Sequence, residues 1–367
     1  MNATTPIGLP VAELDTPALL VDLDLLDRNI ERIAGVVIDE AGINWRPHTK
    51  GLKTPALAHK LIARGAMGVT CAKLGEAEVM ASAGVKDILV ANQVVGPAKT
   101  RRLAHLCRGG ADVVVAVDSE IGIRQIGEAA TAAGSEVRVV VELNVGMDRA
   151  GVARGEEAAR MARVAAGTPG VKLAGLMAWE GHTLGIEPID AKRAAIETAV
   201  GLLTDSADRC RAAGLPIDIV SCGGTGSYWI TARQPGVTEI QAGGGVLGDA
   251  MYRQRFGVDH DCALRIAATV TSRPTPQRVI CDAGRKTMSV EPTTPQVQGI
   301  EVTDAKFSAE HGSLTLADPS AEPGVGERLE FIAGYSDTTV FLHDTIYATR
   351  DGVVEAVWPL LGRGRLT

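Results

Sequence analysis

The sequence predicts an α/β protein in which a (β/α)8 TIM barrel is followed by a C-terminal all-β domain. Three observations support this. Short apolar runs alternate with Ala-rich helical stretches from about residue 43 to 255, and the alternation repeats eight times. The repeat has a spacing of roughly 30 residues, which suits βα units around a parallel barrel. The pattern ends after about Asp261. A doubly wound open sheet is the alternative, but eight successive units favour closure.

The expected barrel strands are short and rich in β-branched residues. They cover Ile43–Arg46, Gly68–Cys71, Asp87–Ala91, Asp112–Val117, Val137–Leu143, Leu173–Ala178, Ile217–Ser221 and Glu239–Gln241. The helices between them cover Pro55–Arg64, Gly75–Ala83, Pro97–Cys107, Ser119–Ala133, Gly155–Ala166, Asp190–Ala213 and the stretch after Gly245. Ser119 is placed to cap the start of its helix, and Gly84, Gly134 and Gly214 stand where helix ends are expected.

After Asp261, short strands broken by Pro, Gly and Asp replace the helical period. They are expected at Arg265–Ser272, Arg278–Cys281, Gly299–Thr303, Gly312–Thr315, Arg328–Ile332 and Val353–Val357, and the early run Ala18–Val21 is a candidate to join them. The predicted domains are therefore a (β/α)8 barrel over residues 25–255 and a β domain made of residues 1–24 and 256–367.

Composition and charge exclude several classes of protein. The 367 residues are 46% apolar and 22% charged, which predicts a large core in a soluble protein. The net charge of −7 argues against a nucleic-acid partner, and no apolar run is long enough to predict a membrane span. Residues 1–10 lack a secretory pattern, and the six cysteines are scattered without a CxxC pair. We therefore expect buried thiols in a reducing compartment, the cytoplasm.

Residues that follow the strands are the candidates for function, because the active site of a barrel lies at the C-terminal ends of its strands. The first strand leads into Arg46-Pro47-His48-Thr49-Lys50. A lysine in that position can bind a carbonyl group covalently if desolvation or a nearby cation keeps its amine neutral. Arg46, His48 or Lys53 could supply the cation. A surface lysine without a role is the alternative.

Three further loops carry groups that bind anions. Arg149, in the loop after the fifth strand, could contact a ligand oxygen or form a salt bridge at the rim. The seventh strand leads into Cys222-Gly223-Gly224-Thr225-Gly226-Ser227, and the eighth into Gly243-Gly244-Gly245. Glycines let backbone N–H groups approach a phosphate, and the Thr and Ser hydroxyls add donors. A phosphate site beside a strand-end lysine points to pyridoxal phosphate, with a phosphosugar substrate as the alternative.

These motifs resemble those of the D-threonine aldolase and D-serine dehydratase family, fold-type III pyridoxal-phosphate enzymes whose barrel is similar to that of alanine racemase. The similarity runs from Asp15-Thr16-Pro17-Ala18 to the last residues. The matching motifs are Arg46-Pro47-His48-x-Lys50, Asp148-Arg149-x-Gly151-Val152, Gly223-Gly224-Thr225-Gly226-Ser227, Asp282-Ala283-Gly284-x-Lys286 and Val357-Trp358-Pro359.

The resemblance implies roles for single residues. Lys50 is expected to hold pyridoxal 5'-phosphate covalently and to carry a proton in the reaction, and Arg149 is expected to contact the phenolic oxygen of the cofactor. The residues expected to hold the phosphate are Gly224, Thr225, Gly226, Gly243 and Gly244. The resemblance also implies a homodimer that acts on a small-molecule amino-acid substrate.

The resemblance implies a lyase that acts on D-β-hydroxy-α-amino acids, and retro-aldol cleavage to glycine and an aldehyde is the leading hypothesis. A dehydratase acting on D-serine or 3-hydroxyaspartate is the first alternative. An amino-acid racemase and a non-catalytic cofactor carrier are the others, although carriers of that kind lack a β domain. The side chain on Cβ is not specified by the sequence.

The chain departs from the family pattern at the metal site. The family places a divalent metal, Mn²⁺ or Mg²⁺, beside the β-hydroxyl, with a His-x-Asp motif in the aldolases. Asp337 matches the aspartate, but Tyr335 stands in place of the histidine, and a neutral phenol is a poor ligand for these ions. The need for a metal therefore stays open, and Tyr335 itself could act as a hydroxyl donor or a base.

Two further departures concern the pocket. Trp179 stands where relatives usually carry Tyr, and Gly245 stands where many relatives carry Tyr. Both changes reshape the pocket, so the native substrate need not be threonine. His182, three residues after Trp179, is a candidate base that touches the substrate. A packed histidine at the rim is the alternative for that residue.

Overall fold

The computed structural model describes residues 6–367, which divide into two compact units. Unit 1 contains the described residues up to Ile30, Gly51–Thr54 and Gly244–Arg363. Unit 2 contains Glu31–Lys50, Pro55–Gly243 and Gly364–Thr367. This division falls at Gly243, whereas the sequence suggests a boundary at residue 255, so the domain limits drawn from the sequence stay a prediction. Within the described residues, no helix combines the length and the apolar character that crossing a membrane requires.

Unit 2 is a parallel barrel of eight strands, in the order β2-β9-β8-β7-β6-β5-β4-β3. The strands are β2 (Asn44–Trp45), β3 (Val69–Cys71), β4 (Asp87–Gln93), β5 (Asp112–Val117), β6 (Val137–Leu143), β7 (Val171–Ala178), β8 (Ile219–Cys222) and β9 (Glu239–Ile240). All eight strands predicted from the sequence are present within a few residues of their expected positions.

Backbone hydrogen bonds close the ring between β2 and β3. The Thr49 N–H donates to the Thr70 carbonyl (2.7 Å), and the Thr70 N–H donates to the Pro47 carbonyl (2.9 Å). His48 pairs with Thr70 in a parallel bridge. The closed barrel predicted from the sequence is therefore confirmed, and the open-sheet alternative is wrong.

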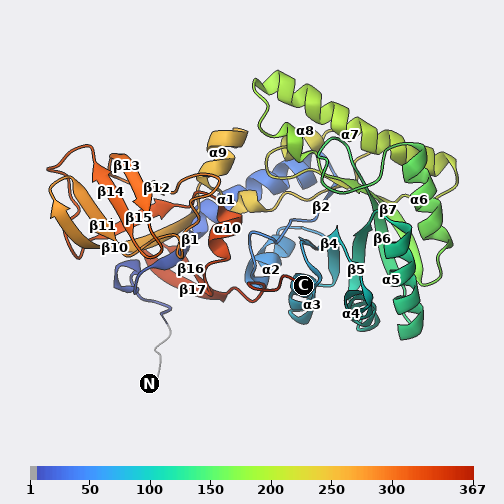
Figure 1. Ribbon diagram of the computed structural model, residues 1–367, viewed down its shortest axis with the longest axis horizontal. Helices are drawn as coiled ribbons and strands as arrows, with labels where there is room; N and C mark the ends of the chain where they lie inside the picture. The colour runs from blue at the N-terminus through green and yellow to red at the C-terminus, as the bar shows by residue number, and fades with distance from the viewer. Residues whose placement is uncertain (1–5) are drawn as a thin grey trace. The chain divides into compact units, whose positions relative to one another are not determined.

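Helices follow the barrel strands, and α4, α5 and α6 cover the outer face of β4–β7 (Figure 1). The helices are α2 (Pro55–Ala63), α3 (Leu74–Ser82), α4 (Pro97–Arg108), α5 (Glu120–Ala133), α6 (Glu156–Gly167), α7 (Ile189–Ala212) and α8 (Tyr228–Thr231), with a short turn at Gly181–Thr183. Ser119 caps α5 by accepting the Gly122 N–H, and Gly134 ends it at φ 65°. Both caps were predicted; the four-residue α8 was not.

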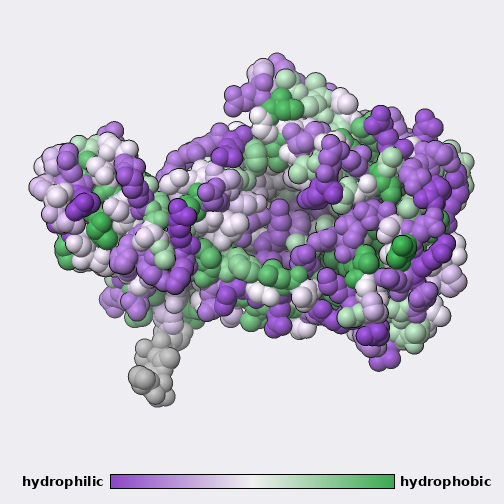
Figure 2. Space-filling view, in the orientation of Figure 1, coloured by the Kyte–Doolittle hydropathy of each residue, from purple (hydrophilic) through white to green (hydrophobic). Residues whose placement is uncertain are grey.

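The barrel core is built from small and β-branched side chains. β5 and β6 are buried almost throughout, as parallel strands covered on both faces should be. The central hydrophobic cluster comprises Leu89, Val114, Ala116, Val140, Ala174, Met177 and Ile219. Hydrophilic side chains dominate the outer surface over α4–α6 (Figure 2). Burial of the strands thus explains why they appear in the sequence as continuous apolar runs.

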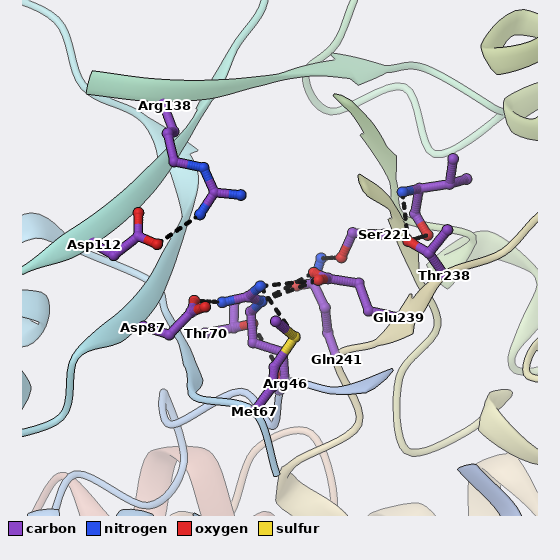
Figure 3. A network of polar contacts seen from close by, with 11 residues as sticks. Arg46, Met67, Thr70, Asp87, Asp112, Arg138, Ser221, Thr238, Glu239 and Gln241 are labelled. Carbon is purple, nitrogen blue, oxygen red and sulfur yellow. Dashed lines mark hydrogen bonds and ion pairs between the residues drawn. The ribbon is translucent and has the colours of Figure 1, made fainter. Parts of the chain in front are cut away.

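A buried ion-pair network occupies the N-terminal end of the barrel strands (Figure 3). Arg46, which is 1% exposed, donates to Glu239 (3.0 Å) and to Asp87. Glu239 and Asp87 are the first residues of β9 and β4, so the guanidinium lies at the end of the barrel opposite the candidate active site. The hypothesis that Arg46 supplies a cation beside Lys50 is therefore wrong.

Unit 1 contains a nine-stranded sheet in the order β13-β14-β11-β10-β1-β16-β17, with β15 paired to β10 and β12. Its strands are β1 (Ala18–Asp22), β10 (Leu264–Thr275), β11 (Arg278–Cys281), β12 (Gln296–Val297), β13 (Val302–Phe307), β14 (Gly312–Leu316), β15 (Arg328–Ile332), β16 (Thr345–Arg350) and β17 (Val353–Pro359). The N-terminal strand joins this sheet as suggested, pairing with β10 and β16.

The sequence predicted an all-β domain, but unit 1 also contains helices. It contains α9 (Ala250–Phe256), α10 (Ser336–Val340) and short turns at Val11–Glu13 and Gly244–Val246. The chain passes from unit 1 to unit 2 within α1 (Leu23–Ala34), which continues into a π-helical turn over Gly35–Glu40. The core of the sheet contains Leu14, Ala18, Leu20, Ala267 and Val354.

Candidate active site

Lys50 follows the first barrel strand, and its neighbours fix the backbone there. The His48 N–H donates to the Gln241 carbonyl (3.0 Å), and the Lys50 N–H donates to Nδ1 of His48 (3.3 Å). The hydroxyl of the fully buried Thr49 donates to the carboxylate of Glu76 (2.7 Å). Lys50 is itself exposed. Hydrogen bonds from His48, Thr49 and Lys50 therefore hold this segment, and Lys50 lies beyond the C-terminal end of the strand.

Arg149 lies in the loop after β6, beside a buried acid. Its Nη2 is 3.6 Å from Oε1 of Glu142, and Oε2 of the same carboxylate accepts a hydrogen bond from Gln93. Burial raises the pKa of the Glu142 carboxyl, while the Gln93 hydrogen bond and the Arg149 charge act in the opposite direction. The Arg149 side chain remains 55% exposed, so its guanidinium keeps N–H groups that can reach a ligand.

His182, in the loop after β7, packs against the loop that carries Arg149. Gly146 has φ 123°, and a Cβ built on it would lie 2.7 Å from Nε2 of His182. A side chain at position 146 would therefore have to displace the imidazole. His182 is also exposed, so the imidazole is available at the strand-end face of the barrel.

The loop after β8, residues 223–227, is buried throughout and is held by Glu180. The Glu180 carboxylate accepts the Gly223 N–H (3.2 Å) and the hydroxyls of Ser227 (2.7 Å) and Thr231 (2.8 Å). The Ser227 hydroxyl is thus directed to Glu180, which corrects the expectation that it serves as a phosphate donor.

Two glycines of this loop are closely approached by side chains of the loop after β7. A Cβ built on Gly224 would lie 2.3 Å from Cη2 of Trp179, and one built on Gly226 would lie 3.0 Å from Cδ2 of Leu184. Thr225, between them, is 4% exposed. The candidate phosphate loop is therefore shaped by its neighbour as well as by its own glycines.

Gly243, after β9, also has a packing reason to be glycine. A Cβ on it would lie 2.2 Å from the carbonyl oxygen of His48, in the segment that leads to Lys50. In unit 1, a Cβ on Gly244 would lie 2.7 Å from the Tyr252 hydroxyl. These positions are buried and closely approached, so they need glycine whether or not a phosphate binds there.

Tyr335 and Asp337 form a hydrogen-bonded pair in unit 1. The Tyr335 hydroxyl donates to Oδ2 of Asp337 (2.8 Å). Burial, and then the charge of Asp337, hold the pKa of the Tyr335 phenol well above its ordinary value, so this group stays protonated. Asp337 packs against Gly51, the residue that follows Lys50 in the sequence, and a Cβ on Gly51 would lie 2.1 Å from its Oδ1.

Asp249 ties the starts of α9 and α10 together. It is fully buried and accepts the Tyr252 N–H, the Ser336 N–H and the Ser336 hydroxyl, each at 2.8 Å. Burial raises the pKa of Asp249 to about 6. The Tyr252 ring packs edge-on against Tyr335, with centroids 6.2 Å apart. These contacts fix the position of the Tyr335–Asp337 pair within unit 1.

Comparison with known proteins identifies the family. Residues 21–251 match the family described as alanine racemase, N-terminal domain, and residues 263–349 match the putative serine dehydratase domain. The chain is 34% identical to a D-threonine aldolase of Arthrobacter sp, over 97% of this chain and 95% of that protein. The chain belongs to the D-threonine aldolase family. A 3-hydroxy-D-aspartate aldolase of Paracoccus denitrificans (strain Pd 1222) is 35% identical, over 98% of this chain and 94% of that protein.

A solved member of the D-threonine aldolase family has the same fold. The crystal structure of D-threonine aldolase from Filomicrobium marinum superposes with a TM-score of 0.94, at 34% identity, over 98% of this chain and 99% of that chain. The barrel and the strand-rich unit described above are therefore the fold of this family.

The residues of this family member do not fit a resident divalent metal. Among residues 6–367, no group of three or more His, Cys, Asp or Glu side chains could hold a metal ion. At the position where the resemblance implies a ligand pair, Tyr335 is a protonated phenol that donates to Asp337. A protonated phenol offers little to Mn²⁺ or Mg²⁺, which favour carboxylate and other oxygen anions.

Sequence reasoning missed the supporting residues of the site. Glu180 follows an apolar strand, between Trp179 and Gly181. A buried charged residue needs hydrogen-bond partners, so its position could have indicated a structural role. Tyr252 gave no signal, because its contacts with Gly244 and Tyr335 arise only in the folded chain.

Proposed function

We propose that the chain is a pyridoxal-phosphate-dependent aldolase that cleaves D-β-hydroxy-α-amino acids into glycine and an aldehyde. The observation that carries the proposal is the 34–35% identity to two aldolases over nearly the whole length of both partners. The position of Lys50 at the end of the first barrel strand supports it, because pyridoxal-phosphate enzymes hold their cofactor on a lysine.

The residues at the strand ends fit the cofactor. Lys50 would hold it covalently, Arg149 would contact its phenolic oxygen, and the loops containing Gly224, Thr225, Gly226, Gly243 and Gly244 would hold its phosphate. The feature that supports the phosphate assignment is the position of the two Gly-rich loops after β8 and β9, because barrels often bind phosphate in the loops after their last two strands. The bound cofactor supplies an electron sink for the negative charge that develops on Cα when the Cα–Cβ bond breaks.

The protein's own residues would handle the protons. We assign to His182 the removal of the proton from the β-hydroxyl, because it is exposed at the strand-end face and the reaction needs a base there. The Lys50 amine would return a proton to Cα once the aldehyde has left. Tyr335 would not act as a base, since burial keeps its phenol protonated, and its one O–H donates to Asp337.

No step is assigned to a metal, because the Tyr335–Asp337 pair is a poor fit for one. Asp337 is the acceptor that orients the Tyr335 hydroxyl in this scheme. We further propose a cytoplasmic homodimer. The six cysteines, none of them in a disulfide and five of them buried, support a reducing compartment, and the dimer rests on the family resemblance.

A dehydratase is the second candidate, supported by the match of residues 263–349 to the putative serine dehydratase domain. Product analysis with D-threonine, 3-hydroxy-D-aspartate and D-serine separates the two. An aldolase yields glycine and an aldehyde from each, whereas a dehydratase yields a 2-oxo acid and ammonia. The L-enantiomers serve as controls. Formation of the enantiomer alone would indicate a racemase, and cofactor binding without any product would indicate a carrier.

A further inference from the structure

Glu180 is a buried carboxylate whose hydrogen-bond donors come from one short segment. The residue is 1% exposed. Its donors are the Gly223 N–H, the Ser227 hydroxyl and the Thr231 hydroxyl, and both carboxylate oxygens take part. Gly223 directly follows β8, Ser227 is the residue before α8, and Thr231 is the last residue of α8. One carboxylate therefore connects both ends of the 223–227 loop.

The neighbours of Glu180 hold the same loop from its other side. Trp179 packs against Gly224 so closely that a Cβ there would overlap its ring, and Leu184 packs against Gly226, where a Cβ would be a tight contact. The segment 179–184 thus contacts the loop through a carboxylate and through two apolar side chains. The backbone path of residues 223–227 is consequently determined by residues of a different strand end.

We propose that Glu180 is a positioning residue that fixes the 223–227 loop in the conformation that receives the phosphate of the cofactor. This rests on the proposed function, which assigns a phosphate to that loop. A carboxylate only accepts hydrogen bonds, so it can take all three donors at once. A glutamine of the same shape has one oxygen and an NH₂ group, so either the NH₂ faces the Gly223 N–H, or the Ser227 and Thr231 hydroxyls must reverse and accept from it; both outcomes disturb the loop.

A structural role alone would give a different result. Loss of a buried carboxylate that merely stabilises the barrel lowers the free energy of unfolding but leaves the preference for a phosphate unchanged. A role in shaping the loop changes the affinity for a phosphorylated ligand more than that for the same ligand without its phosphate. Pyridoxal phosphate and pyridoxal are such a pair, because both can react with Lys50.

The test uses the full-length enzyme, freed of cofactor and titrated with pyridoxal phosphate or pyridoxal while absorbance is followed. For Glu180→Gln we expect affinity for pyridoxal phosphate to fall about ten-fold or more, the effect of losing one hydrogen bond to a charged group. Affinity for pyridoxal should stay unchanged. Thr231→Val, which removes a single donor, should show a smaller loss in the same direction, and it is the variant to use if Glu180→Gln does not fold.

Glu239→Gln is the matched control. Glu239 is equally buried but bonds Arg46 at the opposite end of the barrel. This variant should lower thermal stability and leave the ratio of the two affinities as in wild type. An unchanged ratio in Glu180→Gln, or an equal shift in Glu239→Gln, would overturn the positioning role. A wild-type enzyme that binds pyridoxal as tightly as pyridoxal phosphate would instead count against the proposed phosphate site itself.

Discussion

The hydroxyl of Tyr335 lies 2.8 Å from Oδ2 of Asp337 and donates a hydrogen bond to it. The aspartate is the residue that the family resemblance marks as a metal ligand, and in this chain a neutral phenol engages it. Tyr252 packs against the ring of Tyr335, and Asp249 binds Ser336 between the two partners. Other residues of unit 1 therefore hold the Tyr335–Asp337 pair in place.

We expect wild-type enzyme to bind Mn²⁺ weakly and Tyr335→His to bind it more tightly. The histidine would add a nitrogen ligand next to Asp337. We expect metal affinity to rise about ten-fold or more, because even residues that only hydrogen-bond to a metal ligand change metal affinity by about that factor. Titration calorimetry of chelator-treated holoenzyme measures the affinity. Tyr335→Phe is the control that adds no ligand. A stoichiometric metal that wild type retains and Tyr335→Phe loses would contradict this expectation.

Lys50→Ala should abolish covalent attachment of the cofactor, because it removes the amine that the scheme requires. Borohydride reduction of the holoenzyme followed by peptide mass mapping should find the label on Lys50 in wild type and none in the variant. Lys53→Ala is the matched control, and it should keep the label and the visible absorbance. A label on Lys53, or retention of the label in Lys50→Ala, would show that the assignment is wrong.

The barrel could be predicted from the sequence because parallel strands are buried on both faces and so appear as separate apolar runs. The strand-end position of Lys50 followed from that alone. The position of the Arg46 side chain did not. Four residues of extended chain span about 13 Å, so Arg46 and Lys50 belong to different levels of the barrel even though they share a face.

Several of the missed elements depend on tertiary contacts. α10 has only five residues, Ser336–Val340, with little helix propensity of their own, and it starts where Asp249 binds Ser336. The arrangement around Glu180 likewise needs β7 and β8 side by side. β16 (Thr345–Arg350) was also missed, and it lies in the sheet between β1 and β17.

Asp249 should make the stability of the protein depend on pH. Its pKa in the folded chain is about 6, above the ordinary value of 3.8, because burial penalises the charged form. The native state therefore binds this proton more tightly than the unfolded chain does. The contribution to stability is fully present below about pH 4 and is lost as the pH rises through about 6.

Asp249→Asn removes this titration while keeping a residue that can cap α9. The free energy of unfolding of wild type, relative to the variant, should be higher at about pH 4.5 than at about pH 7.5, by about 2 kcal/mol. Urea unfolding at the two pH values measures the difference. A wild-type advantage that is constant, or that grows with pH, would contradict the raised pKa.

His182 is the residue for which loss of activity should be separable from loss of structure. It packs its imidazole against Gly146 and remains exposed at the strand ends, so His182→Gln removes the base without leaving a buried cavity. We expect kcat to fall about 100-fold or more, within the range for a general base, with cofactor affinity and the melting temperature unchanged.

His59→Gln is the matched control, because His59 is an exposed histidine of α2 that bonds only the Ala83 carbonyl among the contacts described. Its kcat should equal that of wild type. If His182→Gln keeps the wild-type kcat and pH profile on every D-β-hydroxy-α-amino acid tested, the proton is removed by another group, and His182 is a packed residue at the rim.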